Sequence, residues 1–185
     1  KDQVKTVKDA IGGNKLPSFV PVKDQATAKA KTGVNVSHTN TSKKSIPFHS
    51  PRYNNERDVK IFREWVSNNM NKKKTADKIQ FYTDRTGKTS NHAKYRNLEW
   101  DKPSPTIVAH LYKDGLMFIH PDAKQARSIT VKEAGLLQSF PDDYEFVGSM
   151  GSCYKMIGNA VPPEMARRIA LGISEVIIKG NKKSI

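Results

Sequence analysis

Apolar side chains recur at helical spacing between residues 54 and 70, where the hydrophobic pattern of the chain is clearest. Asn54 or Asn55 can cap this segment, and Glu56 and Asp58 suit the first turn of a helix. The pattern therefore predicts an amphipathic helix over residues 54–70. The side chains predicted to face the core are Val59, Phe62, Trp65, Val66 and Met70.

Two more helices are predicted in the last third of the chain. Thr130 and Glu133 have the spacing of a capping box, which predicts a helix that runs to about Ser139. A second helix is expected to begin at Pro162 and to end at Gly180, since proline suits a first turn and glycine a helix end. Its predicted apolar face consists of Met165, Ala166, Ile169, Ile173, Val176 and Ile177.

A β-hairpin is predicted between residues 106–112 and residues 116–119. Both segments are rich in apolar and β-forming side chains, and Asp114-Gly115 between them suits a tight turn. This hairpin is the main β-structure that the pattern predicts.

Residues 1–50 differ from the rest of the chain in their hydrophobic pattern. Residues 6–12 have the pattern of a short capped helix that stops at Gly12, and the low hydrophobicity of residues 23–45 predicts an exposed segment. Taken together, the elements predict an α+β fold, in which a small mixed module is followed by a helical C-terminal arm.

Charge adds a hint about partners. The 185 residues include 32 Lys and Arg against 18 Asp and Glu, and residues 1–100 alone hold 21 against 9. Such a basic excess is typical of proteins that bind nucleic acid, although it equally suits a solvated surface. No apolar run is long enough to span a bilayer, so no membrane partner is expected.

Residue types alone give no catalytic constellation. Cys153 is the single cysteine, and no histidine lies near it in sequence to activate it, so an inert thiol is expected. The histidines lack the spacing of metal ligands, and no metal site is predicted. These histidines are His38, His49, His92, His110 and His120.

Residues 157–163 combine a glycine, an asparagine and a small alanine just before a predicted helix start. The segment can receive a polar ligand group at exposed backbone donors, or it can be a simple helix cap. Spacing alone leaves both interpretations open.

Two long segments closely resemble motifs IX and X of the DNA cytosine-5 methyltransferases. The first is residues 127–144, and the second is residues 154–163 with its Gly158-Asn159-Ala160-Val161-Pro162-Pro163 run. Residues 100–107 resemble the stretch that leads into the target-recognition region of that family, and residues 6–12 resemble the segment after motif VIII. The resemblance therefore extends over nearly the whole chain, and it is strong over residues 95–178.

The resemblance implies a division of the chain into three parts. Residues 1–53 would be a polar linker-like segment after motif VIII, residues 54–126 a small, mixed, β-containing target-recognition domain, and residues 127–185 the helices of motifs IX and X. The helical arm would then complete an α/β methyltransferase domain. The family's Pro-Cys, Glu-Asn-Val, Gln-x-Arg-x-Arg and Phe-x-Gly-x-Gly strings do not occur among the 185 residues. No catalytic residue is therefore assigned, and the chain alone is predicted to be inactive.

The resemblance also implies roles for particular side chains. Asn159 and Ala160 would lie near the methionine end of S-adenosylmethionine, the family's methyl donor. The motif IX residues predicted to be structural are Arg127, Thr130, Glu133 and Gln138. The residues predicted to face DNA are Thr106, Ile107, His110 and Tyr112 in one segment, and Arg85, Lys88, Lys94 and Arg96 in a second.

The leading hypothesis is the C-terminal part of a DNA (cytosine-5-)-methyltransferase, bacterial or from a phage, of the restriction–modification or orphan type. Because the chain begins with Lys1, a piece of a longer enzyme is expected, and the smaller subunit of a split enzyme is the other version. The expected partners are double-stranded DNA and an N-terminal catalytic region or subunit, in the cytoplasm at the nucleoid. The alternative is a non-enzymatic DNA-binding module.

Overall fold

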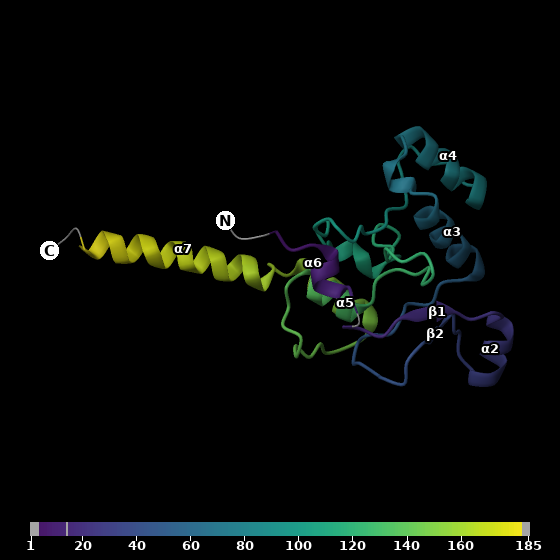
Figure 1. Cartoon of the computed structure of the whole chain (residues 1–185), viewed down its shortest axis with the longest axis horizontal. Coiled ribbons are helices and arrows are strands. Elements are labelled where there is room, and N and C mark those ends of the chain that lie inside the picture. Colours follow the sequence, from purple (N-terminus) through teal and green to yellow (C-terminus); the bar gives the residue numbers. More distant parts are fainter. Residues whose placement is uncertain (1–3, 14, 183–185) are drawn as a thin grey trace.

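A computed structural model describes residues 4–13 and 15–182. Short helices and irregular segments form a body, from which one long helix, α7 (Pro163–Lys182), projects on its own (Figure 1). The other elements, in chain order, are α1 (Val7–Ile11), β1 (Phe19–Pro21), α2 (Gln25–Thr32), β2 (His38–Asn40), α3 (Glu56–Ser67), the 3-10 helix η1 (Met70–Lys72), α4 (Thr75–Thr86), the 3-10 helix η2 (Ala109–Tyr112), α5 (Val131–Leu137) and α6 (Met150–Asn159).

Helix α3 confirms the amphipathic pattern. The side chain of Asn55 caps it by accepting a hydrogen bond from the Asp58 backbone N–H at 2.9 Å. Val59, Phe62 and Trp65 are buried on one face, as the helical spacing predicts. The helix ends a little earlier than expected, and the chain then enters η1 and α4.

Two buried apolar clusters make up the core. One lies under α3 and is formed by Val59, Ile61, Phe62, Trp65, Met70, Phe81, Tyr95, Ile119 and Ala126. The other joins α1, α5 and α6, and contains Val7, Ile11, Leu98, Ile107, Leu111, Phe118, Ile129, Val131, Ala134, Phe146, Cys153, Tyr154 and Ile157. Parts of the chain before, within and after residues 54–126 therefore share the second cluster.

The only sheet in the described residues is a pair of three-residue strands. β1 and β2 are antiparallel, with Phe19 opposite Asn40. The β-structure thus lies within residues 19–40, whereas the sequence placed it in residues 54–126. Residues 23–45 are exposed along α2, as expected, but His38 on β2 is only 8% exposed because it packs inward.

The predicted hairpin is wrong, although its turn is present. Gly115 has φ +68°, and Asp114 accepts a hydrogen bond from the Leu116 backbone N–H, as in a tight turn. Residues 109–112 nevertheless form η2, and Ile119 bridges to Asn97 and Ser128 rather than to the first arm. The first arm packs elsewhere, because Ile107 and Leu111 are buried in the core cluster that also contains Cys153, Tyr154 and Ile157 of α6.

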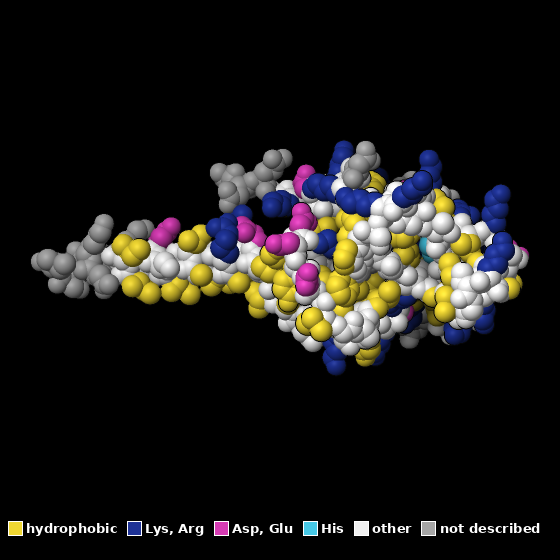
Figure 2. Space-filling view, turned by 90° about the horizontal axis from the view of Figure 1, so that it is seen from below, with side chains coloured by type: hydrophobic (Ala, Val, Ile, Leu, Met, Phe, Trp, Pro, Cys, Tyr) yellow, Lys and Arg dark blue, Asp and Glu magenta, His cyan; other side chains and the backbone are white. Residues whose placement is uncertain are grey.

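The C-terminal helices agree only in part with the prediction. α5 has the expected capping box, and α7 begins at Pro163 but runs through Gly180 instead of ending there. The sequence did not predict α6, which places Cys153 and Tyr154 inside a helix. The apolar face of α7 is uncovered, and Figure 2 shows hydrophobic side chains along its length.

Candidate functional site

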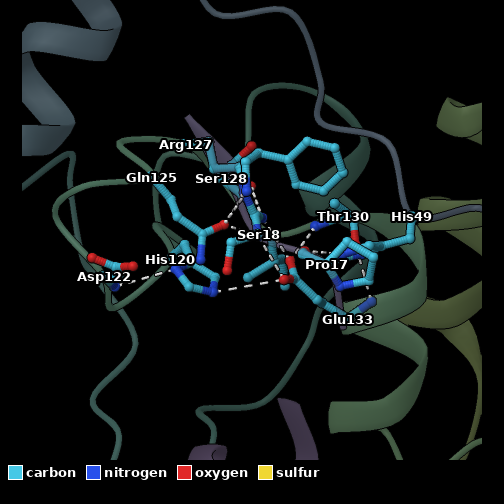
Figure 3. A network of polar contacts seen from close by, with 12 residues as sticks. Pro17, Ser18, His49, His120, Asp122, Gln125, Arg127, Ser128, Thr130 and Glu133 are labelled. Atoms are coloured by element: carbon cyan, nitrogen blue, oxygen red, sulfur yellow. Dashed lines mark hydrogen bonds and ion pairs between the residues drawn. The ribbon is translucent and has the colours of Figure 1, made fainter. Parts of the chain in front are cut away.

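The segment that resembles motif IX contains a buried ion pair. Arg127 Nη1 and Nη2 each donate to a different carboxylate oxygen of Glu133 at 2.7 Å, and both side chains are almost fully buried. Glu133 also accepts from the Thr130 backbone N–H at 2.8 Å, while the Thr130 hydroxyl accepts from the Glu133 N–H. Capping of α5 and pairing with Arg127 therefore use the same carboxylate (Figure 3).

Gln125 extends this network to the N-terminal strands. Its side-chain oxygen accepts from Arg127 Nη2 at 2.7 Å and from the backbone N–H of Phe19 at 3.2 Å. Its backbone oxygen lies 2.9 Å from Nε2 of His38. Residues from β1, β2 and the motif IX segment are thereby joined through one glutamine.

Three buried histidines surround the pair and are held neutral. Burial lowers the pKa of His120 to about 3 and that of His38 to about 4. Burial also lowers the pKa of His49, whose ring nitrogens contact the Thr130 hydroxyl and the Pro17 carbonyl. Neutral rings are compatible with the nearby positive charge of Arg127.

Glu133 remains ionised in this setting. Burial opposes its charge, but the charge and hydrogen bonds of Arg127 outweigh that cost and hold the pKa of the Glu133 carboxyl below its ordinary value. No described group of His, Cys, Asp and Glu side chains is arranged to hold a metal ion. Arg127, Thr130 and Glu133 are all buried, and the structural role that the resemblance implies for them stays a prediction.

Asn159 and Ala160 lie where α6 ends. Asn159 is the last residue of the helix and is exposed, and Ala160 follows as its cap. The sequence placed both residues only before a helix, whereas they also close one. The exposed Asn159 amide offers a donor and an acceptor, and its predicted place near S-adenosylmethionine stays a prediction.

The end of α5 fixes the helices on either side of Asn159. The Gln138 side chain donates to the Ile157 carbonyl at 3.0 Å, and the Ser139 hydroxyl accepts from the Glu164 backbone N–H at 3.0 Å. Two consecutive residues thus fasten the end of α6 and the start of α7. A structural role for Gln138 fits this contact.

Gly158 brings the predicted cofactor segment against the first predicted DNA segment. A Cβ at this position would lie 2.3 Å from backbone atoms of Val108 and Ala109. Only glycine allows α6 to approach the start of η2 so closely. The Thr106–Tyr112 segment is therefore supported from behind by α6.

The first segment predicted to face DNA presents three of its four side chains to solvent. Thr106, His110 and Tyr112 are exposed, whereas Ile107 is 2% exposed and packs in the core beside α6. Ile107 thus contributes to holding the segment in place. Its predicted contact with DNA is confined to what its backbone can offer.

The four basic residues of the second segment predicted to face DNA lie in different environments. Arg85 pairs with Glu64 at 2.6 Å, Lys94 lies 2.9 Å from the His92 ring nitrogen, and Arg96 is half-buried. Lys88 is exposed and lines a surface hollow. The structure therefore leaves Lys88 as the cation of this segment most available to an external anion.

Sequence reasoning missed Arg52. Its Nη2 donates to the Leu111 carbonyl at 2.7 Å, and its guanidinium lies 4.8 Å from the centre of the Tyr154 ring. Arg52 thus joins η2 to α6 from a segment that the sequence treated as linker-like. Only its charge was visible in the sequence, and that charge is one of many.

Cys153 is buried in the first half of α6. Its Sγ lies 3.8 Å from the carbonyls of Val147 and Gly148, and burial raises the pKa of the thiol. A buried thiol with a raised pKa is a poor nucleophile. The expectation of an inert cysteine agrees with this environment.

Comparison with known proteins places these features in a family context. The family model described as C-5 cytosine-specific DNA methylase matches residues 4–175. The type II methyltransferase M.Bpa9945I of Bacillus paralicheniformis is 50% identical over 78 residues, which are 42% of this chain and 18% of that protein. M.AgeI of Thalassovita gelatinovora is 43% identical over 103 residues, 56% of this chain and 23% of that protein.

A third relative is itself short. The type II methyltransferase M.AquIB of Picosynechococcus is 35% identical over 120 residues, which are 59% of this chain and 79% of that relative. The chain thus spans about a fifth of the first two relatives and most of the third. None of the helices in the described residues is long and apolar enough to cross a membrane.

Proposed function

Since the chain belongs to the C-5 cytosine-specific DNA methylase family, we propose that it acts as the C-terminal part of a DNA (cytosine-5-)-methyltransferase. In this role it recognises duplex DNA and completes the cofactor site, while a separate N-terminal region or subunit carries the catalytic cysteine and glutamate. S-adenosylmethionine supplies the methyl group when bound. The enzyme is bacterial or encoded by a phage, and the reaction takes place on DNA in the cytoplasm.

The uncovered face of α7 is the observation that carries this proposal. Ile169, Ile173 and Val176 are 50%, 56% and 71% exposed on a helix that projects from the body (Figure 2). An apolar stripe of this length is costly in water and is typical of a surface that packs on a partner. The catalytic region is the partner that the family implies.

The neighbouring hollow supports the same assembly. A hollow of about 910 Å³ lies between α1, the end of α5 and the start of α7, and its lining includes Ala10, Leu137, Phe140 and Met165. These apolar side chains continue the stripe of α7 onto the body. A catalytic region that packs on both would lie close to Asn159 and Ala160.

The short relative favours the split version of the proposal. The matched residues make up 79% of M.AquIB, so a type II methyltransferase polypeptide of similar extent is known. In the split version a second polypeptide carries the strings associated with catalysis in the family, which do not occur among these 185 residues.

The test is reconstitution of methyl transfer. The chain is mixed with an N-terminal region of M.Bpa9945I that stops before the matched segment, and transfer of labelled methyl from S-adenosylmethionine to duplex DNA is measured. We expect activity from the mixture and none from either part alone. Inactivity of a mixture of two folded parts would contradict the proposal.

A paired variant connects the assay to the structure. Ile169→Glu with Ile173→Glu should abolish reconstitution without unfolding the chain, because both side chains are exposed. The alternative, a DNA-binding module without enzymatic function, predicts duplex binding that S-adenosylmethionine never changes. A gain in DNA affinity with S-adenosylmethionine in the mixture would exclude that alternative.

A further inference from the structure

A basic hollow lies on the body, away from α7. Its volume is about 330 Å³, and it is bounded by α3, α4 and the turn that follows η2. Tyr82 and Tyr95 form part of its wall. The cationic side chains that line it are Arg52, Arg57, Lys88 and Lys113.

The carboxylates of this hollow are already engaged. Asp58 pairs with Arg57 at 3.0 Å, and Asp114 accepts a hydrogen bond from the Leu116 backbone N–H at 3.1 Å. Neither Lys88 nor Lys113 takes part in an ion pair within residues 4–13 and 15–182, and Lys113 Nζ lies 6.0 Å from the centre of the Tyr112 ring. The lining thus keeps a positive excess that suits an anion.

Arg52 lies at one side of the hollow and has an unused donor. Its Nη2 donates to the Leu111 carbonyl, and its guanidinium lies 4.8 Å from the centre of the Tyr154 ring. Its Nη1 is shielded from solvent and has no hydrogen-bond partner within the described part of the chain. A buried donor without an acceptor costs free energy, which an incoming oxygen atom would recover once the side chain shifts toward it.

The hollow also connects the two segments predicted to face DNA. Lys88 belongs to the second segment, and Lys113 directly follows Tyr112 at the end of the first. The loop after α4 and the whole of η2 separate these two lysines along the chain, whereas the structure places them around one hollow. One anion bound there would lie between both segments.

From this geometry we infer that the hollow binds a phosphate group of the duplex DNA backbone, through Lys88, Lys113 and Arg52. The inference rests on the proposed function, because it takes DNA as the source of the phosphate. Lysine and arginine are the usual phosphate ligands, and such contacts fix the register of a protein on the duplex. The hollow accordingly sets where the exposed residues of the Thr106–Tyr112 segment meet the DNA.

The test measures duplex binding by the full chain over a range of salt concentrations. Lys88→Ala with Lys113→Ala should weaken binding about tenfold at moderate salt and lower the salt slope by about 1 to 2. The loss should be the same for unrelated duplex sequences, because phosphate carries no sequence information. Lys43→Ala with Lys44→Ala is the matched control, since it removes the same charge from exposed positions outside the hollow.

The outcomes separate this inference from the proposed function. If the unaltered chain binds duplex DNA and both double variants lose the same affinity, the hollow is not a phosphate site. That result would leave the proposed function standing, because reconstitution of methyl transfer tests the function separately. If the unaltered chain does not bind duplex DNA, the inference and the recognition role are both overturned. Binding of inorganic phosphate that the Lys88 and Lys113 substitutions abolish, with duplex binding unchanged, would overturn the assignment to DNA.

Discussion

Arg127 and Glu133 face each other in a two-pronged ion pair, with both nitrogen–oxygen distances at 2.7 Å and with no more than 2% of either side chain exposed. Removing one partner leaves a buried charge without compensation. We expect Arg127→Met and Glu133→Leu each to lower the free energy of unfolding by about 3–5 kcal/mol. Urea denaturation measures the loss.

The double variant distinguishes pairing from simple packing. Arg127→Met with Glu133→Leu removes both charges and should be less destabilised than either single variant. Arg57→Ala, which breaks an exposed pair with Asp58, should cost at most about 1 kcal/mol. Additive losses in the double variant would contradict a stabilising contact between the two side chains.

Acid should begin to destabilise the fold at a higher pH than the titration of carboxylates alone would. His38 and His120 have folded pKa values of about 4 and about 3, below the ordinary 6.5, so the unfolded chain binds protons first. Stability should therefore fall as the pH drops below about 6.5, by about 2 kcal/mol for each histidine between pH 7 and pH 5. Glu133 adds to the loss below its ordinary pKa of 4.5.

Thermal unfolding from pH 8 to pH 4 checks this sign. His38→Gln should flatten the upper part of the curve, because one of the groups that gains a proton on unfolding is then missing. A melting temperature that stays constant between pH 7 and pH 5 would refute the assignment of neutral buried histidines.

Gly158 and Gly172 should respond in opposite ways to alanine. A Cβ at Gly158 would meet the backbone of Val108 and Ala109 at 2.3 Å, whereas at Gly172 on α7 nothing lies within 4 Å. Gly158→Ala should destabilise the chain by about 1–3 kcal/mol, and Gly172→Ala should stabilise α7 by up to about 1 kcal/mol. Calorimetry measures the stability of both variants. Equal effects of the two substitutions would contradict this prediction.

Cys153 should be dispensable for methyl transfer. It is buried and the pKa of its thiol is raised, so iodoacetamide should label the native chain slowly and the urea-unfolded chain rapidly. In the reconstitution assay, Cys153→Ala should transfer methyl groups at the unaltered rate once its folding is verified. Loss of transfer in a folded variant would assign the thiol a role in the reaction.

Local signals explain which elements the sequence predicted. The Asn55 cap and the spacing of Val59, Phe62 and Trp65 depend only on residues of α3 and its cap. The Thr130–Glu133 capping box likewise depends only on residues at the start of α5. These features need no distant partner, and the structure confirms them. The structural environment of the motif IX residues was predicted through the resemblance, because the spacing itself shows only the cap.

Non-local contacts explain the rest. Asp114-Gly115 does form a turn, but the segments beside it pair with Asn97 and Ser128 or pack on α6. The local sequence pattern does not indicate those partners. In the same way, the polar segment around His38 is ordered by Gln125, more than 80 residues away. Arg52 was missed because its contacts with Leu111 and Tyr154 exist only in the folded chain.

The Gln125–Arg127 contact has a consequence for engineering. It crosses the boundary between residues 126 and 127, at which the resemblance divides the chain, and Gln125 itself contacts Phe19 and His38. A chimera cut at that boundary would join a foreign residue 125 to the native Arg127. A chimera in this region should therefore keep His120 and Gln125 with the recipient, and confine its foreign residues to segments outside this network.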